Sequence, residues 1–411
     1  MDFIFFLYQK TSKIINIYTK NLHLFSRNAW LFLLGTFFIG ISFSGIMLLF
    51  NLYLKSIGLL EGRIGNVITV TTLGTLIMAI PASIALKRFS IKKILIISLP
   101  IALLSYFIQV TISNYYIIMI GGLFSGISSV FFQITAAPFF MRNSAPKERP
   151  YLFSMNFAFT LVASVIGSIM GGFIPEIMEK YGVVDYLAYR HTLYIFGIFI
   201  IIALIPYLMI KENAYQKETE SAQIKPDRSI IVKLFLPNFF VGLGAGLSIP
   251  FINLYFKNIF SMSTKVIGVY YSLSQVMTII GLLIAPLLAE KIGKIKTVIF
   301  SQLFSIPFLI ILGITNNVAL AVVSFLIRAA MMNMAQPLFT NFAMESVKKE
   351  EQPLTNALLV IAWSIGRGLS ATIGGLLIEK YSYAIPFLTT GALYLISTIL
   401  ILIFFKQKEF R

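Results

Sequence analysis

Twelve long apolar stretches constrain this 411-residue chain more than any other feature of its sequence. Each comes close to or exceeds the roughly 20 residues with which a helix crosses the hydrocarbon core of a bilayer. None alternates between apolar and polar residues as a barrel strand does, so helices are predicted. The sequence therefore predicts an all-α membrane protein with twelve transmembrane helices. The stretches span residues 30–54, 64–86, 94–113, 115–140, 151–174, 190–210, 230–256, 266–289, 297–314, 318–342, 354–378 and 384–405.

The composition supports this class of protein and excludes others. The chain is 58% hydrophobic and only 12% charged, so most of its surface must face lipid. It has no Cys and only two His, His23 and His191, which excludes a Cys/His metal centre and a catalytic thiol. No cluster of His, Asp or Glu falls within a stretch, so we expect neither an enzyme nor a bound cofactor.

The distribution of Lys and Arg predicts the orientation in the membrane. With the amino terminus inside, 24 of the 33 basic residues fall in the termini and loops on the inner side, and seven fall on the outer side. This bias predicts a multi-pass protein of the cell membrane with both termini in the cytoplasm. It also explains the net charge of +17, so nucleic acid is not an expected partner.

Polar segments divide the chain. Residues 1–29 are predicted to form a cytoplasmic amphipathic arm, with a frayed tail as the alternative, and residues 406–411 a cytoplasmic tail. The polar run 211–229 is a predicted cytoplasmic linker between a bundle over residues 30–210 and another over 230–405.

An internal repeat relates the two bundles. The motif Asn51-Leu-Tyr-Leu-Lys55 ends the first stretch, and Asn253-Leu-Tyr-Phe-Lys257 ends the seventh. After one extra residue in the second half the match continues, and it places Gln133 on Gln336. A register that holds over six stretches indicates two homologous six-helix bundles in parallel orientation.

This plan is that of the major facilitator superfamily, which the chain also resembles in its short cytoplasmic loops. The family has G-x-L-A-D-R-x-G-R-K between its second and third helices, and residues 83–93 resemble a decayed copy with Lys87 at the acidic position. The copy in the second half, Leu288-Ala-Glu290-Lys-Ile-Gly293-Lys294, is closer. The resemblance covers residues 30–405 and implies the major facilitator fold and transport by alternating access.

These loops are candidate gates. A turn between antiparallel helices favours Gly or another small residue, here Gly293 and Ser90. Glu290 could pair with the opposite bundle and hold the inner side closed, whereas Lys87 could not. The alternative is that the basic residues only anchor the topology. The candidate gating residues are Arg88, Lys92, Lys93, Glu290, Lys291, Gly293 and Lys294.

Two arginines within the apolar stretches are the leading candidates for substrate contacts. Arg328 and Arg367 each lie roughly 20 Å from the predicted cytoplasmic end of their helices. Two guanidinium groups at one depth repel each other unless an anion lies between them, and no acidic residue occurs mid-span. A carboxylate or phosphate of the substrate would suit both. Structural hydrogen bonds to the helices are the alternative.

Other polar or aromatic side chains could join this site. Trp363 precedes Arg367 by one turn and could stack on it, although packing against lipid or core is the alternative. Gln336, Gln133 and Asn333 could bind substrate or bridge helices. The resemblance implies that the fourth and tenth helices, which carry them, line a central cavity.

These features predict a monomeric secondary transporter that moves a small solute across the bilayer, with an organic anion as the candidate that the two arginines suggest. Alternatives are a drug or lipid efflux carrier of the same fold and a receptor or scaffold that does not transport. None of the 16 acidic residues lies mid-span, so we expect no dedicated proton-carrying carboxylate, with Glu345 at a span end as the exception to consider.

Overall fold

The computed structural model describes residues 25–145, 148–211, 228–348 and 351–405. Most of the predicted arm, most of the linker and the predicted tail lie outside these residues. Twelve helices or helix pairs are long and apolar enough to cross a membrane, as predicted. The helices are α2 (Arg27–Ser56), α3 (Glu61–Arg88), α4 (Ile91–Thr111), α5 (Tyr115–Arg142), α6 (Arg149–Lys180), α7 (Asp185–Met209), α8 (Arg228–Ser248), α9 (Ile252–Phe260), α10 (Thr264–Ile292), α11 (Lys294–Ile314), α12 (Val318–Glu345), α13 (Gln352–Lys380) and α14 (Ala384–Phe405).

The seventh span alone is assembled from more than one helix. It consists of α8, a 3-10 turn η1 (Ile249–Phe251) and α9. Pro250 lies in this turn, where its missing N–H cannot join an α-helical ladder. The first span, its counterpart in the repeat, runs unbroken as α2.

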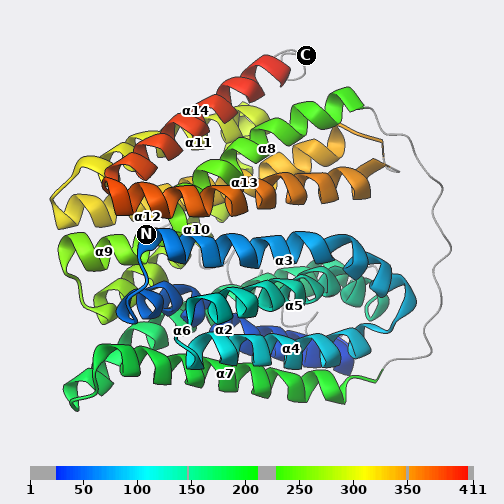
Figure 1. Ribbon diagram of the computed structural model, residues 1–411. Coiled ribbons are helices and arrows are strands. Elements are labelled where there is room, and N and C mark those ends of the chain that lie inside the picture. Colours follow the sequence, from blue (N-terminus) through cyan, green and yellow to red (C-terminus); the bar gives the residue numbers. More distant parts are fainter. Residues whose placement is uncertain (1–24, 146–147, 212–227, 349–350, 406–411) are drawn as a thin grey trace, which may run out of the picture.

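The helices form two bundles that lie side by side (Figure 1), α2–α7 in one and α8–α14 in the other. The repeat is visible in their hydrogen bonds. Tyr53 donates its hydroxyl proton to the carbonyl of Val110 at 2.6 Å, and Tyr255 donates to the carbonyl of Leu312 at 2.7 Å. Each bond joins the first and third spans of its own half. The predicted duplication is therefore reproduced in side-chain contacts.

The turn between the second and third spans of each half has a different backbone conformation in the two halves. Gly293 has φ 88° between α10 and α11, a conformation that side chains with a Cβ rarely adopt. Its counterpart Ser90 has an ordinary φ of −68°, and its Oγ accepts from the N–H of Lys93 to cap α4. The small residue at this turn was predicted for its flexibility, but Ser90 acts as a helix cap.

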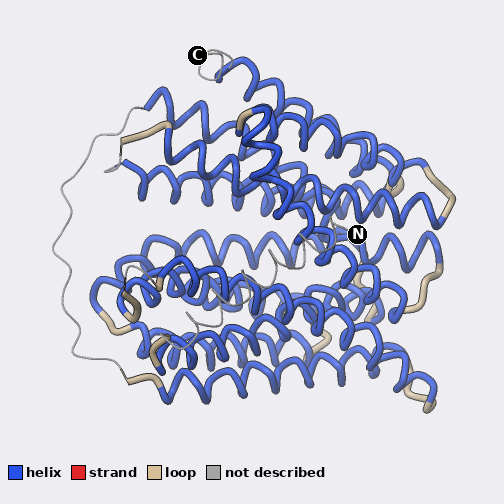
Figure 2. The backbone as a smooth tube through the Cα atoms, turned by 180° about the vertical axis from the view of Figure 1, so that it is seen from behind, coloured by secondary structure: helices blue, strands red, loops and turns tan. Residues whose placement is uncertain are grey.

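The two halves contact each other near one end, which we call the far end because it lies opposite the linker. Thr69 of α3 donates to the carbonyl of Gly368 in α13 at 2.6 Å. In the symmetry-related place, Ser272 of α10 donates to the carbonyl of Val165 in α6 at 3.2 Å. The ribbons of α3 and α13 diverge toward the other end, the linker end (Figures 1 and 2).

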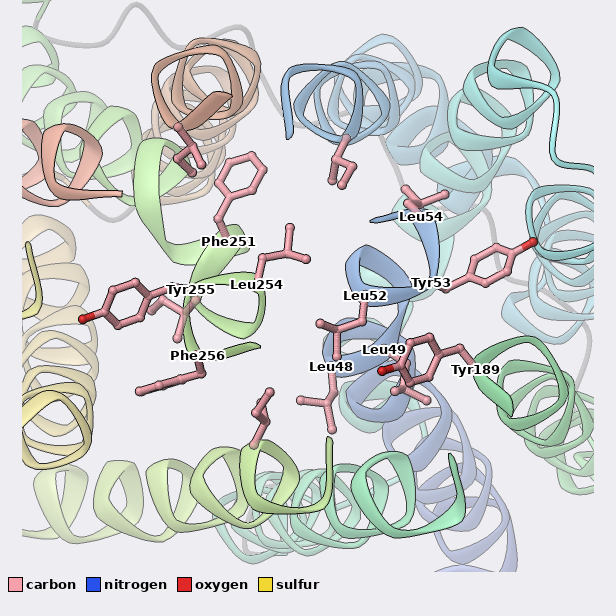
Figure 3. Packing of buried hydrophobic residues seen from close by; sticks show 14 of the residues in the cluster. Leu48, Leu49, Leu52, Tyr53, Leu54, Tyr189, Phe251, Leu254, Tyr255 and Phe256 are labelled. Carbon is pink, nitrogen blue, oxygen red and sulfur yellow. The ribbon is translucent and has the colours of Figure 1, made fainter. Parts of the chain in front are cut away.

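The hydrophobic core follows the same arrangement. One cluster crosses between the halves, with Leu48 and Leu52 of α2 on one side and Leu254 of α9 on the other. Figure 3 shows these leucines facing the middle, whereas Tyr53 and Tyr255 point in opposite directions into their own halves. Two further clusters lie within single halves. The apolar core therefore joins the halves at the far end and leaves them separate toward the linker.

Candidate functional site

Arg328 is buried inside the second bundle. It lies on α12 with 6% of its surface exposed, and its Nε atom has no hydrogen-bond partner among the described residues. Tyr394 of α14 makes a polar contact with its side chain, and Tyr271 of α10 lies within electrostatic range. Neither phenol carries a charge that would neutralise the guanidinium, so a buried cation is left without an anion.

Arg367 of α13 approaches the same tyrosine. Its guanidinium interacts electrostatically with the Tyr394 hydroxyl, as that of Arg328 does. The Arg367 Cζ atom also lies 4.9 Å from the centre of the Trp363 ring, within the range of a cation–π contact. The structure thus brings Arg328 and Arg367 near one phenol, with Trp363 stacked on Arg367.

The helix that carries Tyr394, α14, packs against α8, the first helix of the second bundle. The Oγ1 atom of Thr390, one turn earlier on α14, lies 2.8 Å from the carbonyl oxygen of Gly244 and 2.9 Å from the hydroxyl oxygen of Ser248, both on α8. Its one proton can be donated to only one acceptor at a time. Because these contacts are buried, they hold the register of α14 against α8 and so position Tyr394 near the two arginines.

The predicted amide side chains fall in three different settings. Asn333 donates to the hydroxyl of Thr278 at 3.1 Å and to the carbonyl of Ala329 at 2.9 Å, which ties α12 to α10. Gln336 lines a small cavity inside the second bundle, together with Asn238 and Gln302. Gln133 is exposed on α5. Among the described residues, none of the three forms a hydrogen bond with Arg328 or Arg367, so the amides are not part of the arginine cluster.

The candidate gating residues lie at the linker end. Lys92 donates to the carbonyl of Ile210 in its own half, and Lys294 forms an ion pair with Glu345 in the other half. The remaining members, Arg88, Lys93, Glu290 and Lys291, lie in the helix ends that flank the same two turns, and Gly293 forms the turn described above. The Lys92–Ile210 bond and the Lys294–Glu345 ion pair each lie within a single half.

A buried carboxylate at the far end was not predicted from the sequence. Glu61 begins α3 with 5% of its surface exposed, and Lys55 pairs with it at 2.8 Å. Asn258 of α9, in the other half, donates to Glu61 at 3.4 Å and to the Tyr383 hydroxyl at 2.9 Å. Burial and the nearby Glu61 carboxylate raise the pKa of Tyr383, so its hydroxyl stays protonated. The predicted spans 30–54 and 64–86 leave Glu61 in a loop, and nothing in the sequence indicates its burial, because that burial depends on the opposite half.

Tyr271 and Tyr394 were also missed as neighbours of the arginines. They are two of 19 tyrosines, and nothing in an apolar stretch distinguishes a tyrosine that faces a cation from one that faces lipid. Their position in the repeat offers no signal either, since the arginines have no counterpart in the first half.

Solved structures resemble this fold over nearly its whole length. A bacterial homologue of the iron transporter ferroportin, in an inward-facing state, aligns with a TM-score of 0.75 at 13% identity, covering 92% of this chain and 98% of its own. A bacterial homologue of the human lysosomal transporter Spinster aligns with a TM-score of 0.74 at 14% identity, covering 93% and 97%. The nucleoside transporter NupG gives 0.74 at 13%, covering 93% and 100%. At these identities the likeness shows the fold alone.

A sequence comparison with curated proteins gives no match. The family model described as Major Facilitator Superfamily matches residues 32–238 and 234–411, which together cover both bundles and the linker between them. The chain therefore belongs to the Major Facilitator Superfamily and is a membrane transporter.

Proposed function

We propose that this transporter carries a small organic anion by alternating access, with Arg328 and Arg367 as the groups that bind its negative charge. The observation that supports this most strongly is the burial of Arg328 with an unpartnered Nε atom. Leaving a buried cation unpaired is costly, and a bound carboxylate or phosphate would remove that cost.

The surroundings of the pair favour an exchangeable anion over a fixed one. Two ion pairs of the described structure, Lys55–Glu61 and Lys294–Glu345, lie near opposite ends of the molecule and do not involve the arginines. Tyr394 can share a hydrogen bond with a guanidinium but cannot neutralise it. The compensating charge must then arrive with a ligand and leave with it, which is what transport requires.

Membership of the superfamily does not select the cargo. The similar solved structures are named for nucleoside, iron and lysosomal transport, so their titles span chemically unrelated solutes. The charge of the arginine cluster is the feature of this chain that narrows the choice to anions.

The test is binding and counterflow of a panel of organic anions, sugars, amino acids and lipophilic cations by purified protein in proteoliposomes. Replacing Arg328 by Ala should weaken binding of the preferred anion by on the order of 2–5 kcal/mol, because one partner of a buried charge pair is lost. Arg328→Lys should restore only part of it, since an ammonium lacks the planar fork of donors.

A matched control is Arg63→Ala. Arg63 also stacks on an aromatic ring, that of Tyr115 at 5.2 Å, but it is exposed at the far end. We expect Arg63→Ala to bind the anion as the unaltered protein does. Preference for a cation, with equal binding by both Arg328 variants, would exclude an anion carrier. Anion binding without any counterflow would instead identify a receptor.

A further inference from the structure

The break in the seventh span coincides with a pair of hydrogen bonds between the halves. Asn51 of α2 donates from Nδ2 to the carbonyl of Pro250 at 2.6 Å, and Asn253 of α9 donates from Nδ2 to the carbonyl of Leu48 at 2.7 Å. The donors are equivalent positions of the repeat, and so are the acceptors. Both asparagines are buried, at 7% and 0% exposure. We call these two bonds the asparagine clasp.

The two acceptors differ in their helices. Leu48 lies within the unbroken α2, where its carbonyl can also serve the helix itself. Pro250 lies in the 3-10 turn, and in a continuous α-helix its carbonyl would accept from the amide of Leu254. That amide instead donates to the side-chain Oδ1 of Asn253 at 2.9 Å. The broken span therefore offers the Pro250 carbonyl to Asn51.

Asn253 thus forms hydrogen bonds with both Leu254 and Leu48. Its Oδ1 occupies the amide of Leu254, and its Nδ2 reaches across to Leu48. If the halves separated at the far end, the Pro250 carbonyl and the amide of each asparagine would lose their partners in a buried setting. An unpaired buried polar group is costly, so the Pro250 carbonyl would need a new partner. It could accept from the Leu254 amide if the turn became α-helical.

We propose that the asparagine clasp and the break in the seventh span form one two-state latch for the far end. With the far end closed, Asn51 stabilises the broken span. With the far end open, the Pro250 carbonyl bonds to Leu254 and the span between α8 and α9 becomes more regular. The latch concerns the conformations of the protein and does not depend on which solute it carries.

Aromatic contacts link the latch to the arginine cluster. Phe325 lies one turn before Arg328 on α12 and packs on Phe256 of α9, with ring centres 5.5 Å apart. The same Phe325 packs on Tyr271 of α10, also at 5.5 Å. Tyr271 in turn lies near the backbone of Asn253. A change in α9 must therefore displace the side chains that surround Arg328.

The latch can be tested by spin-label distances without any ligand. Because the chain has no Cys, labels can be placed at Tyr181→Cys and Tyr381→Cys, which are strongly exposed at the far ends of α6 and α13. Leu is close to Asn in shape but cannot donate a hydrogen bond, so Asn51→Leu and Asn253→Leu each remove one bond of the clasp. Each should raise the ratio of long to short label distances on the order of tenfold, the effect of one buried hydrogen bond.

Asn238→Leu is the matched control. Asn238 is as buried as Asn51 and donates from Nδ2 to the carbonyl of Leu359 at the same 2.6 Å, but both residues lie in the second half. It should lower the melting temperature without changing the far-end distance. A shift equal to that of the clasp variants, or no shift in any of the three, would overturn the proposal.

A fourth variant tests the break separately. Pro250→Ala keeps both asparagines and restores the N–H that a continuous helix needs. It should also favour the long distance, because the regular span no longer presents the carbonyl to Asn51. This variant remains informative if a clasp variant does not fold. If Pro250→Ala keeps the short distance, the break and the clasp are independent and the latch does not exist.

Discussion

At the scale of single residues, the charged side chains of the candidate site could be predicted from the sequence, but the uncharged side chains that contact them could not. An arginine in an apolar stretch is conspicuous, so Arg328 and Arg367 could be singled out from composition alone. Tyr394, which lies near both arginines, could not be singled out, because its position depends on how α14 packs against α12 and α13. Glu61 shows the same limit, since its burial requires the second half.

Removing the Tyr394 hydroxyl should reveal the cost of burying the Arg328 guanidinium. We expect Tyr394→Phe to reduce the free energy of unfolding by about 1–3 kcal/mol, because Arg328 loses its polar contact in a buried setting. Once the preferred anion is identified, its addition should raise the melting temperature of this variant more than that of the unaltered protein. The measurement is thermal unfolding in detergent with and without the anion.

Tyr207→Phe provides the comparison for this variant. Tyr207 is also fully buried, but its hydroxyl lies 3.4 Å from the Oγ1 of Thr36 in the first half, away from the arginines. Its loss should destabilise the protein equally with and without anion. A recovery by anion that is the same in both variants would mean that Tyr394 is unrelated to the ligand.

At the scale of elements, hydropathy predicted where helices lie but not where one is interrupted. The twelve spans follow from length and composition, which the chain displays directly. The 3-10 turn at Pro250 was not predicted, because many spans here contain Pro and remain α-helical, as α10 does at Pro286. What distinguishes Pro250 is the acceptor that its carbonyl provides for the opposite half.

Close helix approach at the far end should be intolerant of a single methyl group. A Cβ added to Gly268 of α10 would lie 2.6 Å from the carbonyl oxygen of Ser168 in α6. Gly268→Ala should therefore cost about 1–3 kcal/mol of stability through overpacking, or separate the far ends of the halves. Melting temperature and the far-end label distance together measure both responses.

Gly391→Ala is the control for this substitution. The nearest atom to its added Cβ would be 3.5 Å away, on Ile306, which is an ordinary contact. Since Ala favours helix over Gly, the change in α14 should be neutral or stabilising. If Gly268→Ala behaves in the same way, the helices at the far end are not in contact as described.

At the scale of the whole molecule, the bias of basic residues predicts which end faces the cytoplasm. With both termini inside, a Cys introduced at Asn316 should react with an impermeant thiol reagent added to intact cells, and one at Ser221 should not. The absence of native Cys removes background labelling. Reaction of the Ser221→Cys protein before the cells are opened would reverse the orientation.

The contacts between the halves have a consequence for the surface that each half presents. Thr69 and Ser272 donate to carbonyls of the opposite half at equivalent positions, and so do Asn51 and Asn253. Each of these two kinds of bond is thus made twice, once in each direction. This is the geometry of an isologous dimer, in which a single self-complementary face meets its own copy about a two-fold axis. The transporter is in this sense a tethered homodimer in which only one of the two copies contains the buried arginines.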